Sequence, residues 1–161
     1  MNILKLISNT KYVYTERPTP VAGTLRTEWR CAIILLILDT VCRKKKSSLF
    51  KLHLFNWSLK SNDNAQIVIN ILKGEVKPYV ATIRFDPYLI RALMYLISTN
   101  LINRVGSESF SLTDLGQQIA GEMLSDDELF IREKYMLSSL KAGEVSEAHI
   151  SKLFKVGSRG H

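Results

Sequence analysis

The side chains that could perform chemistry are scattered along this chain at spacings that fit no common catalytic site. The three histidines, His53, His149 and His161, have no cysteine or carboxylate at the spacing of a metal site. No serine lies in a nucleophile-elbow pattern, and Gly106 is not followed by the glycine and lysine of a phosphate-binding loop. We therefore expect a protein that is not an enzyme and that needs no cofactor and no metal.

Two further groups of reactive side chains have simpler explanations. Asp126, Asp127 and Glu128 would occupy the first turn of a helix, where carboxylates stabilise the free amides. A two-metal nuclease site is the alternative interpretation of these three acids. Cys31 and Cys42 lie within one apolar segment and are typical of small buried residues in a cytosolic protein.

The positive charge is concentrated in the first half of the chain. The formal net charge of +7 divides into +9 for residues 1–84 and −2 for residues 85–161. A run of cations, 43–46, follows an apolar helix, where the negative end of the helix dipole stabilises positive charge. The alternative is that the same run contacts phosphates. The candidates for a nucleic-acid contact are Arg43, Lys44, Lys45, Lys46, Lys51 and Lys60.

Tyrosine and arginine side chains are the candidates for binding a partner protein, because tyrosine is enriched at interfaces. One group, Tyr88, Arg91 and Tyr95, is spaced along a single helix, where packing at the edge of the core is the alternative for the tyrosines. A second group lies in an N-terminal arm. We expect this arm to be a strap that packs on the body of the protein or on a partner, and the alternative is a disordered leader. It comprises Tyr12, Tyr14, Arg17 and Pro18.

The elements that must position these side chains centre on residues 86–123. Asp86 is a good N-cap, and Pro87 suits the first helical position. Asn100 ends the helix, residues 101–105 and 110–112 form a hairpin with its tip at 106–109, and Thr113 caps a further helix. The apolar stripe expected to face the core is Leu89, Ile90, Leu93, Met94, Ile97 and Leu101.

Further helices are expected around this unit, the last of them a short one that starts at Ser146. The first covers residues 27–41 with Thr27 as its cap, and Ser47 or Ser48 caps the second, which carries Lys51, His53 and Lys60 on its wetter side. A third covers 65–72 and ends at Gly74, and residues 78–85 are extended. Ser125 and Glu128 form a capping box that opens the fourth.

The predicted fold is mainly α with a small β-hairpin: a winged-helix-like core over residues 27–124, an N-terminal arm over 1–26, and a C-terminal helical extension with a flexible tail over 125–161. The longest apolar run, 31–38, is much shorter than the roughly 20 residues of a membrane span. With no signal peptide visible, we expect a cytoplasmic protein.

In the order of its predicted elements and motifs, the chain resembles the small middle component of bacterial three-component ABC-ATPase systems, the group that includes Lamassu-type defence against phage and plasmids. The likeness covers roughly residues 14–124, with Asn100 where a glycine is usual. It is carried by Arg17-Pro18, the apolar stretch 29–38, Phe85-Asp86-Pro87-Tyr88-Leu89, Asn100-Leu101-Ile102 and Phe110-Ser111-Leu112-Thr113-Asp114-Leu115-Gly116.

The resemblance implies a non-catalytic adaptor subunit that sits between an SMC-like ATPase and an effector, often a nuclease. DNA would then be contacted within the complex, through those partners. The rival interpretation is a free-standing winged-helix DNA-binding regulator, which would need the six cations named above to form one face towards the phosphates.

Overall fold

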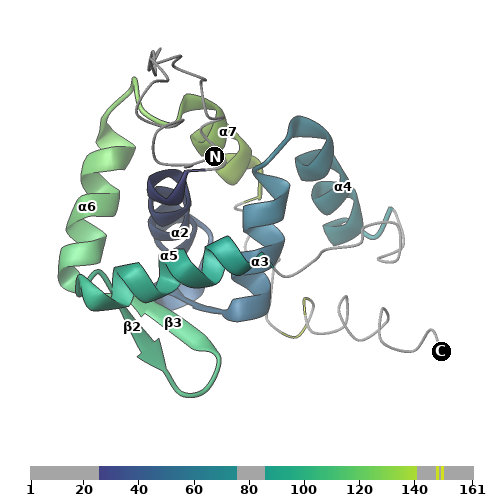
Figure 1. Cartoon of the computed structure of the whole chain (residues 1–161). Helices are drawn as coiled ribbons and strands as arrows, with labels where there is room; N and C mark the ends of the chain where they lie inside the picture. Colours follow the sequence, from purple (N-terminus) through teal and green to yellow (C-terminus); the bar gives the residue numbers. More distant parts are fainter. Residues whose placement is uncertain (1–25, 76–85, 141–147, 149, 151–161) are drawn as a thin grey trace, which may run out of the picture.

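The computed structural model describes residues 26–75, 86–140, 148 and 150, and the chain is mainly helical with a small three-stranded antiparallel sheet (Figure 1). Its helices are α2 (Thr27–Thr40), α3 (Leu49–Ser58), α4 (Asn62–Leu72), α5 (Pro87–Ser98), α6 (Asp114–Ser125) and α7 (Ile131–Leu140), with a 3-10 turn, η2 (Arg43–Lys45), after α2. The strands are β1 (Lys46–Ser48), β2 (Ile102–Val105) and β3 (Ser109–Leu112).

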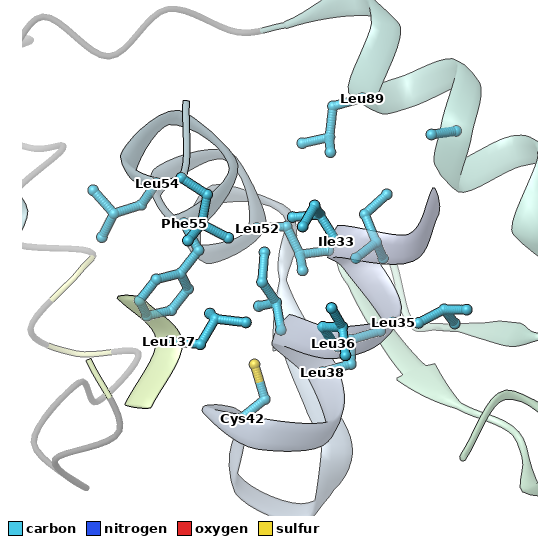
Figure 2. Packing of buried hydrophobic residues seen from close by; sticks show 14 of the residues in the cluster. Ile33, Leu35, Leu36, Leu38, Cys42, Leu52, Leu54, Phe55, Leu89 and Leu137 are labelled. Atoms are coloured by element: carbon cyan, nitrogen blue, oxygen red, sulfur yellow. The ribbon is translucent and has the colours of Figure 1, made fainter. Parts of the chain in front are cut away.

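Helix α2 is the centre of the core. Its residues 33–38 are almost completely buried, because α3, α5, α6 and α7 all pack around it. Figure 2 shows side chains of α2 meeting Leu52 and Phe55 of α3, Leu89 of α5 and Leu137 of α7. The expectation of a helix buried on more than one side is confirmed.

Local capping chemistry fixes several element ends where the sequence predicted them. The side chains of Ser48, Asp86 and Thr113 each accept a hydrogen bond from an amide in the first turn of α3, α5 and α6. Gly74 and Asn100 adopt positive φ just beyond α4 and α5. The N-cap of α2, however, is Arg26 without a side-chain hydrogen bond, so the prediction for Thr27 is wrong.

The sheet is larger than the predicted hairpin. Besides the β2–β3 pair, β1 lies antiparallel to β3 with Ser47 opposite Phe110, and the strand order is β1-β3-β2. Because β1 connects α2 to α3, it ties the first half of the chain to the hairpin of the second half.

The C-terminal part differs from the predicted capping box. Ser125 is the last residue of α6, and a loop separates it from α7, which begins at Ile131. The side chains of Met136, Leu137 and Leu140 belong to the same hydrophobic core as α2. Helix α7 is therefore part of the main body.

Candidate partner-binding site

Helix α5 carries the candidate site, and its ends are fixed by local sequence. Asp86 accepts a hydrogen bond from the Tyr88 amide at 3.0 Å, and Pro87 follows where no amide hydrogen is needed. At the other end the Leu101 amide donates to the Leu96 carbonyl at 2.9 Å, across Asn100 at φ 59°. Both ends are thus locked, and the rotation of the helix about its axis is set by which side chains enter the core.

The buried face of α5 is rotated relative to the predicted stripe. Leu89 and Leu93 are buried as expected, but Ala92 and Leu96 accompany them, while Ile90 and Met94 are exposed. Two of the six predicted stripe residues are therefore wrong. The reason is that α5 is apolar on most of its circumference, so spacing alone does not define one face.

The opposite face presents large side chains to solvent. Tyr88 is 53% exposed, Tyr95 57% and Met94 67%, and Arg91 is also exposed. The structure therefore brings the three predicted α5 residues together on one surface and adds Met94 to them. Figure 1 shows α5 lying across the front of the molecule, next to the β2–β3 hairpin.

A buried polar cluster holds the N-terminal end of α5 in place. Asp86 Oδ2 accepts hydrogen bonds from Arg30 Nε and Nη2 on α2, both at 3.3 Å, and from Asn56 Nδ2 on α3 at 3.3 Å. Lys60, two residues beyond α3, donates to the same oxygen at 3.0 Å. The Asp86 amide donates to His53 Nδ1 at 3.3 Å. Three helices thus meet at one carboxylate.

Opposing effects set the ionisation of this cluster. Burial alone would raise the pKa of Asp86, but the hydrogen bond and charge of Lys60, the Tyr88 amide and the charge of Arg30 outweigh it and lower the pKa to about 2. Burial lowers the pKa of His53, the Asp86 charge acts against that shift, and the Lys60 charge adds to it. The cluster therefore holds an ionised Asp86 beside a histidine that resists protonation.

The buried cluster reaches the exposed face through Tyr88. The Arg30 guanidinium lies 5.2 Å from the centroid of the Tyr88 ring, and that of Arg91 lies 5.7 Å from it. Both distances are within the range of cation–π attraction. The ring is thereby held in position while half of its surface stays open to solvent.

The six cations predicted to contact nucleic acid do not form one surface. Lys51 is only 3% exposed, Lys60 is bound to Asp86, and Lys45 forms an ion pair with Asp39. Arg43, Lys44 and Lys46 remain exposed at the turn between α2 and β1. The expectation that Lys51 and His53 lie on a wetter side of α3 is wrong, because both are buried between α3 and its neighbours.

The remaining predicted site residues, Tyr12, Tyr14, Arg17 and Pro18, lie outside the described residues, as does the segment 78–85. Sequence reasoning missed Arg30, which lies within an apolar helix and shows no local sign of its contact with Asp86. Over the described ranges, 26–75 and 86–140 with residues 148 and 150, there is no cluster of three metal-ligating side chains and no helix that is long and apolar enough to span a membrane.

Comparisons with known proteins returned no match to a family model, to a curated protein or to a solved structure.

Proposed function

We propose that this protein is a non-catalytic adaptor that binds a partner protein through the exposed face of α5. The observation that carries the proposal is the group of Tyr88, Met94 and Tyr95, each more than half exposed on a single helix. Large aromatic and methionine side chains displayed together are typical of protein interfaces, where they supply much of the binding energy. Folding alone gives no reason to hold them in water.

The pre-positioned Tyr88 ring supports this role. A side chain already fixed between Arg30 and Arg91 loses little freedom when a partner covers it, so less of the binding free energy is offset by ordering. The buried cluster around Asp86 then acts as the support of the interface.

The order of elements favours a winged-helix interpretation of the fold. A helix (α2), a short strand (β1), further helices and a hairpin (β2–β3) follow one another, and β1 pairs with the hairpin. In DNA-binding members of this class, the helix before the hairpin carries cations and amides towards the groove. Helix α5 would hold that position, but it offers Arg91 as its one charged residue in Pro87–Ser98.

Together with the resemblance described above, these features favour a subunit of an SMC-like ATPase complex in defence against phage and plasmids. The adaptor would bridge the ATPase and an effector such as a nuclease. The test is co-expression with a large ATPase encoded beside it: we expect a stable complex of defined mass. If both proteins are soluble but purify separately, the proposal is contradicted.

A second candidate function, a DNA-binding regulator, is favoured by the exposed turn with Arg43, Lys44 and Lys46. A regulator would bind duplex DNA alone with a steep salt dependence, and replacing these three cations by alanine would reduce that dependence. Under the adaptor proposal, the isolated protein binds duplex DNA weakly. Fluorescence anisotropy with a labelled duplex at several salt concentrations measures both. Tight binding to one specific duplex by the chain alone would favour the regulator instead.

A further inference from the structure

A second group of exposed apolar side chains lies on α7 and the loop before it. Leu129 is 43% exposed, Ile131 64% and Tyr135 74%. We call these three residues the α7 patch. Ile131 and Tyr135 are one turn apart, so their side chains project from the same side of the helix. In Figure 1, α7 lies at the top of the molecule and α5 across its front.

The chain holds the α7 patch firmly. Phe130 adopts a φ of 50°, which is uncommon for a residue with a bulky side chain, and its ring packs against the core. On α7, Arg132 Nη2 donates to the Leu59 carbonyl at 2.7 Å, and Glu133 Oε1 accepts from Trp29 Nε1 at 3.4 Å. The three apolar side chains are therefore presented on a backbone that is fixed from both sides.

The charges beside the α7 patch are mostly negative. Asp126, Asp127 and Glu128 are exposed immediately before Leu129, and within the described residues no cation forms an ion pair with them. The two nearby cations are already engaged, because Arg132 binds the Leu59 carbonyl and Glu133, and Lys134 Nζ binds the Asp126 carbonyl. Residues 126–134 thus contain four carboxylates and two cations, so the described residues give the apolar surface a net acidic border.

We propose that the α7 patch docks a basic, apolar segment of a second partner protein. Such a segment would cover Ile131 and Tyr135 with aliphatic or aromatic side chains and pair its Lys or Arg residues with the acids at 126–128. The acidic border repels nucleic acid, so this surface is selective for protein. Because α7 and α5 are different helices with different charge, the two surfaces suit two different partners, as bridging requires.

The experiment uses a library of random 16-residue peptides displayed on phage, selected against the full-length protein. Selected peptides are then synthesised and their affinities measured by fluorescence anisotropy. The test variant is Ile131→Ala with Tyr135→Ala, and the matched control is Leu115→Ala, an exposed apolar residue of α6. Thermal unfolding of each variant checks that the fold is retained.

We expect selected peptides that combine Lys or Arg with Leu, Phe or Trp. Their affinity should fall about tenfold or more in the test variant and remain unchanged in the Leu115 control. It should also fall in Asp127→Asn with Glu128→Gln, with a weaker dependence on salt. Tyr88→Ala with Tyr95→Ala should leave it unchanged, which separates this proposal from the function proposed for α5.

Several results would overturn the inference. The first is that the selection enriches no peptides, and the second is that the enriched peptides lack basic residues. The third is that the enriched peptides bind the test variant and the wild type with equal affinity. A synthetic peptide of residues 1–25 that displaces the selected peptides would show that the occupant is a segment of this chain and not a second partner. Loss of binding in the Tyr88 and Tyr95 variant alone would place the peptides on α5.

Discussion

Asp86 connects the interior of the protein to the exposed face of α5. Its carboxylate caps the helix through the Tyr88 amide and pairs with Arg30 and Lys60. Arg30 is buried, and Asp86 is the only carboxylate with which it forms an ion pair in the described part of the chain. A single side chain therefore determines where α5 begins and what supports its first exposed tyrosine.

Replacing Asp86 by asparagine tests the charge separately from the cap. Asparagine can still cap the helix, but Arg30 would remain buried without a carboxylate, so we expect a loss of about 3 kcal/mol or more in the free energy of unfolding. Urea denaturation measures it. The matched control is Asp114→Asn in the first turn of α6, where the exposed carboxylate makes no ion pair that the structure describes and the cost should stay below about 1 kcal/mol. Equal losses in the two variants would refute the role of the buried charge.

The same cluster predicts how stability depends on pH. The pKa of Asp86 is lower in the folded state than the ordinary value of 3.8, so the unfolded chain takes up the proton first. Its stabilising effect is present above pH 4 and is lost as the pH falls towards 2. The pKa of His53 is also lowered below 6.5, so stability already begins to fall below about pH 6.5. Urea titrations between pH 8 and 2 should show both steps, and Asp86→Asn should lack the acidic one.

At the level of elements, most helix caps could be predicted from the sequence because they depend on neighbouring residues, although the predictions for Thr27 and Ser125 were wrong. Ser48, Asp86, Thr113, Gly74 and Asn100 all act as their residue types suggest. Features that depend on distant partners could not be predicted. The three residues of β1 carry no strand pattern and pair only because β3 lies beside them, and Lys51 is buried by contacts that the α3 sequence does not encode.

The contact between α6 and the segment that joins α5 to β2 depends on Gly116. A Cβ atom placed there would lie 2.0 Å from the Leu101 carbonyl oxygen, which also accepts a hydrogen bond from the Thr113 amide. Because backbone must move to admit a methyl group, Gly116→Ala should cost about 1–3 kcal/mol. Gly121→Ala on the same helix meets no atom within 4 Å and should be neutral or stabilise by up to about 1 kcal/mol. Thermal or urea unfolding of both variants checks the pair, and equal stability would contradict the close approach.

For the whole molecule, the net charge of the sequence did not predict where its cations lie. The basic character of the first half suggested a DNA surface, yet Arg30, Lys51 and Lys60 are used inside the body or at its edge. What the sequence could indicate was the group Tyr88, Arg91 and Tyr95, because their helical spacing places them on one face. Their exposure could not be predicted, since apolar residues cover most of the circumference of α5 and the rotation that leaves Met94 outside is decided by packing on α2.

The adaptor proposal is tested most directly by Tyr88→Ala combined with Tyr95→Ala. The measurement is the affinity of the full-length variant for the ATPase proposed as its partner, compared with wild type and with Leu115→Ala, an exposed apolar residue of α6. We predict a loss of about tenfold or more for the double variant, little change for the control, and a fold that both variants retain in thermal unfolding. Binding of the double variant at wild-type affinity would contradict the assignment of α5 as the partner-binding surface.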